Sequence, residues 1–185
     1  KAYNHFLHDD NLNNFAKAGS FGTSWGVGNA APGSGIIILA TSDVELYNNR
    51  IINNNSSAIS IASGLTVDDK AMEKINATYF PISRNISIHD NIMEMGQSFP
   101  KEAYTHHMGQ MLVGVEQKLA QLDPSRKNTR IPFILYDGVT TNIMNNGTLA
   151  NPDSICIRQT GTNLFVNADI MHISSKSWHP DTDIK

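Results

Sequence analysis

The sequence has little of what several large classes of protein require. It contains one cysteine, Cys156, which excludes internal disulfides and cysteine-based metal clusters. The 14 Lys and Arg residues are outnumbered by 17 Asp and Glu, so the net charge is −3, whereas nucleic-acid-binding domains usually carry clear positive charge. No apolar run approaches the roughly 18 residues that a membrane-spanning helix needs. We therefore expect no nucleic-acid partner and no membrane span.

Asparagine and isoleucine are abundant instead, with 20 of each among the 185 residues. Asn is a poor helix and strand former that favours turns, and Ile favours strands. The combination predicts many short strands separated by many tight turns. The length fits one domain that can bury a sizeable core.

Short segments of the sequence repeat. Residues 85–93 (NISIHDNIM) can be laid over residues 163–171 (NLFVNADIM) without a gap, and residues 43–51 (DVELYNNRI) follow the same pattern. At the N-terminus, residues 2–7 (AYNHFL) align with residues 46–51 (LYNNRI). Each copy is a short alternating strand followed by a polar turn and a second apolar pair.

A second type of strand precedes some copies, at residues 36–38, 59–61 and 155–157, and the first two are 23 residues apart. A period near 23 with two or three short strands is typical of a parallel β-helix. We therefore predict an all-β, right-handed parallel β-helix over residues 1–175, with a tail at 176–185. Alternation predicts inward side chains at Ile36, Ile38, Val44, Leu46, Ile59, Ile61, Ile86, Ile88, Ile155, Ile157, Leu164 and Val166.

The polar turns of the copies align in one column, formed by His5, Asn49, Asn91 and Asp169. An Asn inside a stacked turn can hydrogen-bond the backbone of its own and neighbouring coils, and it tolerates left-handed backbone. The alternative is a polar strip that binds a ligand. We expect the structural role.

Three insertions interrupt the predicted coils, at residues 13–34, 62–83 and 97–131, the second with a short helix around residues 68–75. The third carries the clearest helical pattern, around residues 100–122, which Asp123-Pro124 ends. Its apolar stripe consists of Met108, Met111, Leu112, Val115, Leu119 and Leu122. We expect this stripe to pack against the β-helix wall rather than bind a partner.

The aligned repeats resemble those of bacterial exported parallel β-helix repeat-containing proteins, within the pectate-lyase-like superfamily. The matching stretches are residues 32–40 (PGSGIIILA), 43–49 (DVELYNN), 86–91 (ISIHDN), 134–138 (ILYDG) and 155–158 (ICIR). The resemblance spans about residues 1–170 and covers the C-terminal half of the family's longer members. It implies a right-handed β-helix, with export to the periplasm or cell surface, often as a lipoprotein. It implies no activity, because fold analogy to polysaccharide lyases does not establish their chemistry.

One acidic pair is a candidate metal site. Asp9 and Asp10 lie beside His5 and His8, and two carboxylates on one turn could share a hard cation such as calcium. No third acidic residue is close in sequence, so the alternative is a solvated turn. We expect no cofactor, with calcium as the one candidate.

A column of outward side chains is a candidate ligand site. The repeats place Tyr3, Tyr47, His89 and Asn167 at the same outward position. The Tyr and His side chains could bind a polysaccharide, because aromatic faces pack on pyranose rings. Ordinary stacking between coils explains the column equally well.

Candidate catalytic residues are few. Polysaccharide lyases on this fold need cations against a uronate carboxylate and a base near the acidic proton of the sugar. His5, His89 and Asp137 are the candidates here, although Asp137-Gly138 also has the composition of a simple turn.

Two functions are compatible with these patterns. The first is an exported interaction module that binds a partner protein or a glycan along a sheet face. The second is a carbohydrate-active enzyme, a lyase or hydrolase of acidic glycans, with its site partly in N-terminal coils that precede this sequence. The enzyme would be favoured if five polar residues lay together in one groove. These residues are His5, Asp9, Asp10, Lys17 and Arg50.

The first coil presents a further problem, because the repeat begins at residue 2. An uncovered end of a β-helix exposes core residues and unpaired strand edges. We therefore predict that another chain, the 13–34 insertion or preceding coils cover this end.

Overall fold

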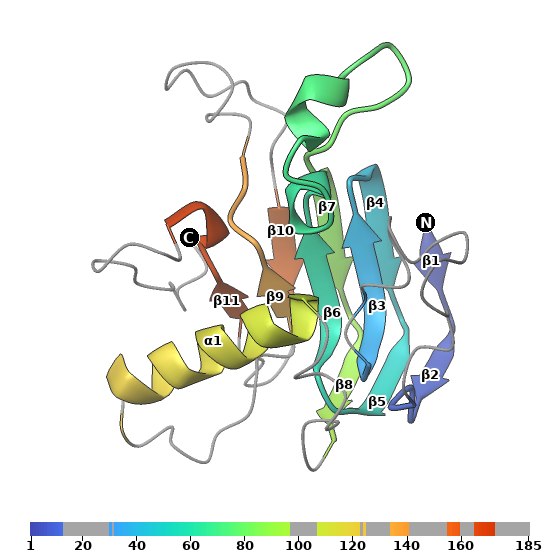
Figure 1. Cartoon of the computed structure of the whole chain (residues 1–185). Helices are drawn as coiled ribbons and strands as arrows, with labels where there is room; N and C mark the ends of the chain where they lie inside the picture. Colours follow the sequence, from blue (N-terminus) through green and yellow to red (C-terminus); the bar gives the residue numbers. More distant parts are fainter. Residues whose placement is uncertain are drawn as a thin grey trace.

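In a computed structural model, the described part of the chain is mostly β, with parallel sheets and one α-helix (Figure 1). The structure describes residues 1–12, 30, 32–96, 107–122, 124, 134–140, 155–159 and 165–172. The strands in this part of the chain form three sheets, here called A, B and C, and every pairing is parallel. Sheet A contains β1 (Ala2–Tyr3), β4 (Ser42–Tyr47), β7 (Arg84–His89) and β10 (Ile155–Arg158), in that order. Sheet B contains β2 (Phe6–His8), β5 (Arg50–Asn54) and β8 (Ile92–Met95). Sheet C contains β11 (Phe165–Asn167), β9 (Ile134–Tyr136), β6 (Ser57–Ala62) and β3 (Ser34–Leu39).

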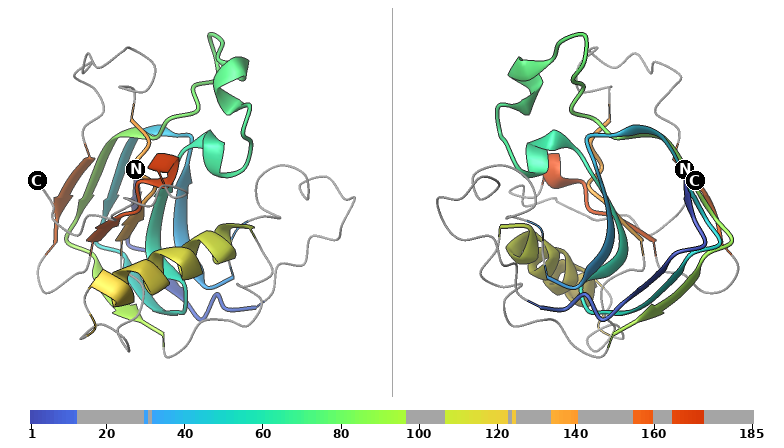
Figure 2. Two further views of the ribbon diagram at one scale, coloured as in Figure 1. Left: turned by 60° about the vertical axis from the view of Figure 1, so that its left-hand side comes forward. Right: turned by 90° about the vertical axis from the view of Figure 1, so that its right-hand side faces the viewer.

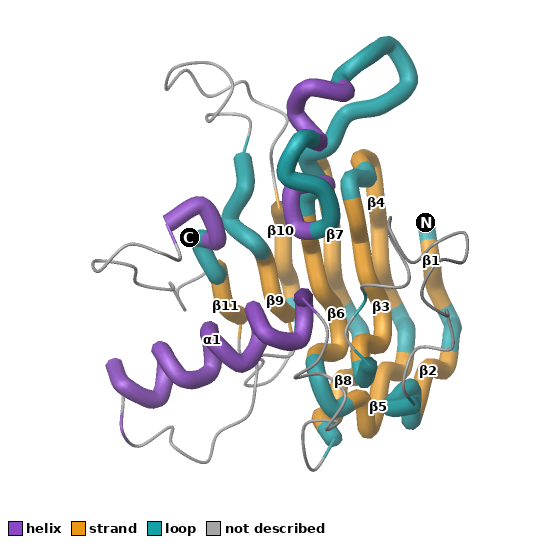
Figure 3. The backbone as a smooth tube through the Cα atoms, in the orientation of Figure 1, coloured by secondary structure: helices purple, strands orange, loops and turns teal. Residues whose placement is uncertain are grey.

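The chain visits the sheets in a repeating order. It passes through β3, β4 and β5, and then through β6, β7 and β8; we call each such passage a coil. Ile36 pairs with Ile59, which confirms the 23-residue period, and Val44 pairs with Ile86. The traces of successive coils overlie one another in the end view (Figure 2, right), and the tube in Figure 3 follows the same path. This arrangement is consistent with a parallel β solenoid.

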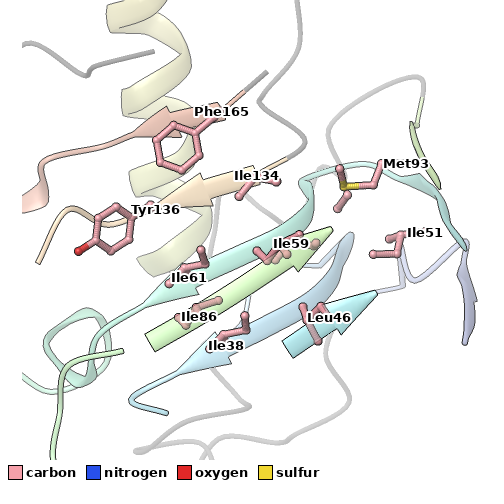
Figure 4. Close-up of a cluster of buried hydrophobic side chains, with 12 residues drawn as sticks. Ile38, Leu46, Ile51, Ile59, Ile61, Ile86, Met93, Ile134, Tyr136 and Phe165 are labelled. Carbon is pink, nitrogen blue, oxygen red and sulfur yellow. The ribbon is translucent and has the colours of Figure 1, made fainter. Parts of the chain in front are cut away.

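Stacked isoleucines fill the interior between the sheets (Figure 4). Ile51, Ile59 and Ile88 are fully buried there. Of the predicted inward positions, ten belong to this core or pack against it: Ile36, Ile38, Val44, Leu46, Ile59, Ile61, Ile86, Ile88, Ile155 and Ile157. The alternation of apolar residues along each strand, with a period of two, therefore correctly predicts which side chains form the core of these coils.

The last predicted repeat is wrong. The repeat pattern predicts the second strand type at residues 155–157, but Ile155 pairs with Ile86 in sheet A. β11 lies in sheet C instead, where Phe165 pairs with Ile134 in the core and Val166 is buried on the opposite face. Both faces of sheet C are covered here, so the apolar run at 164–166 has no alternation from which to read the register. The predicted inward Leu164 lies outside the described residues.

Helix α1 (His107–Leu122) covers the outer face of sheet C, as Figures 1 and 2 show. Its buried side chains Leu112, Val115 and Leu119 form a second apolar cluster with Leu135 and Val166. These three residues of the stripe pack against the wall, as predicted, whereas Leu122 is 43% exposed. The helix ends at Leu122, as Asp123-Pro124 indicates. The expected start near residue 100, and the side chains of Met108 and Met111, lie outside what the structure describes.

Two 3₁₀ helices, Gly64–Thr66 and Ala71–Lys74, occupy the insertion between β6 and β7, and the second overlaps the predicted helix at 68–75. Residues 13–29 and the tail at 176–185 lie outside the described residues. Among the residues described, no helix combines the length and apolar character that crossing a membrane requires. β1 and β3 each lie at one edge of their sheets, and Tyr3 is 47% exposed. That another segment or chain covers this end stays a prediction.

Candidate functional site

The outer face of sheet A carries a stack of rings at equivalent positions of successive coils. Parallel, in-register strands place Tyr3 beside Tyr47 and Tyr47 beside His89. The Tyr3 and Tyr47 ring centroids are 4.9 Å apart with planes 12° apart, and those of Tyr47 and His89 are 5.3 Å apart with planes 3° apart. We call these three side chains the ring stack. The fourth position belongs to Arg158 rather than to the expected Asn167, because β10 and not β11 pairs with β7.

The ring stack limits how a ligand can be bound. Tyr47 is half-buried, and its ring lies between those of Tyr3 and His89. The inner ring, Tyr47, therefore offers its edge and its hydroxyl group, since both of its faces are occupied by neighbouring rings. Packing of a sugar on an open face of Tyr47, as the sequence suggested, is blocked in this arrangement. Hydrogen bonding along the stack is possible.

Charged side chains of alternating sign cross the same face of the sheet. Lys1 Nζ lies 2.7 Å from Glu45 Oε2, and Glu45 Oε1 lies 3.2 Å from His89 Nε2. His89 Nδ1 lies 2.8 Å from Asp90 Oδ2, which in turn lies 3.7 Å from an Arg158 guanidinium nitrogen. We call these five residues the charge chain. It links β1, β4, β7 and β10, which are far apart in the sequence.

Contacts within the charge chain shift the pKa values of its members. Hydrogen bonds with Asp90, and then with Glu45, raise the pKa of His89 above 6.5. Hydrogen bonds with Lys1, and then with His89, lower the pKa of Glu45, while His89 lowers the pKa of Asp90. Each carboxylate is thereby held in its charged form, and the imidazole favours the protonated form.

Beneath this surface, a ladder of side-chain amides joins the turns between sheets A and B. The Asn49 N–H donates to Asn91 Oδ1 at 3.0 Å, and the Asn91 N–H donates to Gln159 Oε1 at 2.9 Å. Asn91 Nδ2 also donates to the Leu46 carbonyl, at 3.0 Å. Asn49 and Asn91 are 1% and 5% exposed, so these two of the four predicted column residues are buried and hydrogen-bond the backbone of a neighbouring coil. We call Asn49, Asn91 and Gln159 the amide ladder.

Two members of the predicted turn column differ from the expectation. His5 joins the ladder only through its backbone N–H, which donates to Asn49 Oδ1, and its side chain is exposed. Asp169 lies elsewhere, with its carboxylate on His172, and Gln159 takes the predicted place of Asp169. The cause is again the pairing of β10, rather than β11, with β7.

Residues with left-handed backbone line the corners of the coils. Asn4, Asn48 and Asp90 occupy equivalent positions with φ of 58°, 53° and 53°. Asp9 and Asn53 form a second such column, with φ of 57° and 55°. Because Asn and Asp tolerate this conformation better than other residues with a Cβ, these corners explain part of the high Asn content.

The candidate metal residues lie beyond the end of β2. The Asp9 carboxylate contacts His8 Nδ1 at 2.8 Å and the Asn53 side-chain amide. The Asp10 N–H donates to Asn54 Oδ1 at 3.0 Å. In the described part of the chain, no group of three or more His, Cys, Asp or Glu side chains could hold a metal ion. Calcium binding at Asp9 and Asp10 stays a prediction.

The residues proposed to converge in an enzymatic groove are spread along sheet B. The Arg50 N–H bonds the His5 carbonyl at the start of β2, and the Arg50 guanidinium lies over the Phe6 ring at 5.4 Å. Asp9 and Asp10 follow the far end of the same strand. Lys17 lies outside the described residues. The four residues that can be located therefore form no common site.

Asp137 is buried at the corner that follows β9, with 4% of its surface exposed. Its Oδ2 accepts the Ser63 N–H at 2.5 Å, and its Oδ1 accepts the Val139 N–H at 3.0 Å. Burial raises the pKa of this carboxyl group. Gly138 follows with φ of 82°, which fits the turn indicated by the sequence. The contacts of Asp137 are those of a group that joins two coils, rather than of a group that reaches a substrate.

Replacing Asp137 by Asn is expected to lower the free energy of unfolding by about 1–3 kcal/mol, because the amide NH₂ group replaces one of the two accepting oxygens and leaves one buried N–H without a partner. The folded state holds the Asp137 proton more tightly than the unfolded state does. The contribution of Asp137 to the free energy of unfolding of the wild type therefore falls as the pH rises from about 4 through the raised pKa of this group. Urea unfolding at pH 4.5 and 7.5 should show the gap between wild type and variant narrowing at the higher pH. Parallel pH profiles would contradict this account.

Five residues of the charge chain and the amide ladder, Lys1, Glu45, Asp90, Arg158 and Gln159, are absent from the candidates that the sequence patterns indicate. A signal for the last two is present, because residues 155–158 (ICIR) match residues 86–89 (ISIH) in their alternating pattern. Cys156 on this strand is exposed and pairs with Ser87.

Comparisons with protein-family models, curated proteins and solved structures found no match for the chain.

Proposed function

We propose that the chain is a right-handed parallel β-helix of the bacterial exported type, and that it is a non-catalytic module that binds a glycan along the outer face of sheet A. Export to the periplasm or cell surface is part of this proposal and rests on the family resemblance. The observation that carries the binding proposal is the ring stack of Tyr3, Tyr47 and His89, flanked by the charge chain. The ring stack and the charge chain together form a strip on sheet A. This strip runs across the strands, so it suits an extended ligand.

The chemistry of the strip favours a polyhydroxylated chain over a protein surface. The core of a protein interface is depleted of charge and relies on buried apolar side chains. The strip instead combines phenol groups with two carboxylates, an ammonium and a guanidinium. Sugar hydroxyls both donate and accept hydrogen bonds, so they can use both kinds of group. The cations Lys1, His89 and Arg158 are each paired with a carboxylate of this surface, so they leave no unpaired cation for an acidic chain, and we therefore propose a neutral glycan.

The same contacts argue against the enzyme. A base must be unprotonated to abstract a proton, and His89 is held between two carboxylates that favour its protonated form. The other catalytic candidates do not join it, since His5 is exposed beside sheet B and Asp137 is buried with its oxygens on backbone N–H groups.

Binding should be tested with immobilised neutral polysaccharides, such as glucans, mannans and xylans, alongside uronate polymers. Tyr47→Ala is expected to weaken binding to the neutral polymer by about tenfold or more, because it removes the centre of the ring stack. Phe6→Ala is the matched control, because Phe6 is an exposed aromatic residue of sheet B. The thermal unfolding of both variants should be compared with that of the wild type.

Three outcomes would overturn this proposal. Equal loss of binding in the Tyr47 and Phe6 variants would remove sheet A as the site. Unsaturated products released from a uronate polymer would favour the lyase. Failure of all the polysaccharides, together with tight binding of a protein partner that Tyr47→Ala weakens, would favour the protein-binding alternative.

A further inference from the structure

Both ring nitrogens of His89 face carboxylate oxygens. Nδ1 lies 2.8 Å from Asp90 Oδ2, and Nε2 lies 3.2 Å from Glu45 Oε1. A neutral imidazole carries one N–H, whereas an imidazolium carries two, and an ionised carboxylate only accepts. Both hydrogen bonds can therefore form together only when His89 is protonated. The ring is held in this orientation, because its side chain is 18% exposed and stacks on Tyr47.

The two contacts of His89 have different structural consequences. Asp90 is the next residue in the chain, so its contact is local. Glu45 lies on β4, so the Nε2 contact joins two coils. Glu45 also binds Lys1 beside β1, and Asp90 faces Arg158 of β10. The charged and titratable groups that face or adjoin His89 are Glu45 and Tyr47 from β4, Arg158 from β10 and Asp90 from its own segment.

We propose that His89 is a pH-sensitive latch on sheet A: its second proton ties β7 to β4 through Glu45, and loss of that proton releases Glu45. The remaining proton stays on Nδ1, which makes the shorter contact. The two cations, Lys1 and Arg158, balance the carboxylates of Glu45 and Asp90, so the charge chain changes from one net positive charge to none. A role of the latch in ligand binding rests on the proposed function, but the latch itself does not.

The direction of the pH response follows from the raised pKa of His89. A group whose pKa is raised by folding contributes its full stabilisation below its unfolded pKa, which is about 6.5 for histidine. The contribution is lost as the pH rises through the folded value. The latch is therefore closed below pH 6.5 and opens as the pH rises through the raised pKa of His89.

The test is a pH titration of the His89 ring nitrogens by long-range ¹⁵N–¹H NMR. In the wild type we expect the doubly protonated pattern at pH 6 and a titration midpoint above 6.5. Glu45→Gln should lower this midpoint, because a neutral amide replaces the carboxylate that faces Nε2. His8→Gln is the matched control, since His8 contacts one carboxylate and lies on sheet B, and it should leave the His89 midpoint unchanged.

Two results would overturn the latch: a single-proton pattern of His89 at pH 6, or the same midpoint in wild type and Glu45→Gln. This readout uses no ligand, so a failed polysaccharide screen would leave the latch standing. A failed latch would equally leave the binding proposal standing, provided that Tyr47→Ala still weakened binding.

Discussion

Replacing Asn91 by alanine is expected to lower the free energy of unfolding by about 3–5 kcal/mol, through buried polar groups that lose their partners. The Asn91 side chain accepts the Asn49 N–H at 3.0 Å and donates to the Leu46 carbonyl at 3.0 Å and the His89 carbonyl at 2.9 Å. No water can readily replace it, because Asn91 is 5% exposed and Asn49 is 1% exposed. Chemical denaturation monitored by circular dichroism would measure the change.

The control for this variant is Ser87→Ala, on the outer face of the adjoining strand β7. A substitution of an outward, half-exposed serine should change stability by no more than about 0.5 kcal/mol. Asn91→Asp adds a further comparison, because it keeps the acceptor but removes the donor and adds a buried charge. If Asn91→Ala were as mild as the Ser87 control, the amide ladder would not be a main stabiliser of the stacked coils.

Replacing Ile59 by alanine is expected to cost about 2–5 kcal/mol, from lost burial and from the cavity that remains. Ile59 is fully buried in sheet C, where it lies in the apolar cluster of Figure 4. It pairs with Ile36 on one side and Ile134 on the other. The neighbouring coils limit collapse of the cavity, because their backbones are fixed by ladder hydrogen bonds on both sides. Urea denaturation of the folded protein would measure the loss.

Ile92→Ala is the matched control for the core variant, because the same side chain is removed at a position that is 58% exposed. Its expected effect is within about 0.5 kcal/mol. Equal losses at Ile59 and Ile92 would show that the interior of the coils contributes no more to stability than their surface does. A much smaller loss at Ile59 would indicate that the coils close around the vacated space.

The pairing of β10 decided most of the differences between the predicted and the observed site. Residues 155–158 fit either strand type by their own pattern, and the insertion at 97–131 breaks the count of residues between coils before them. Their pairing with β7 brings Arg158 to the charge chain and Gln159 to the amide ladder. The position of β10 in sheet A, rather than in the sheet that the repeat pattern predicts, therefore changes two residues of the site. The prediction that residues 155–157 form a strand is unaffected.

The amino-acid sequence by itself determined the features that depend on neighbouring residues. These are the alternating strands, the coil period between Ile36 and Ile59, the buried Asn49 and Asn91, and the apolar stripe of α1. Each of these features follows from a short-range period of apolar residues or from the backbone preference of single residues. Both can be recognised within a short segment of sequence. The tertiary structure alone decided which strands stack after the insertions, and therefore which charges meet on sheet A. Glu45, His89 and Arg158 belong to one charge chain only because the parallel strands lie in register. This register depends on the whole stack of coils.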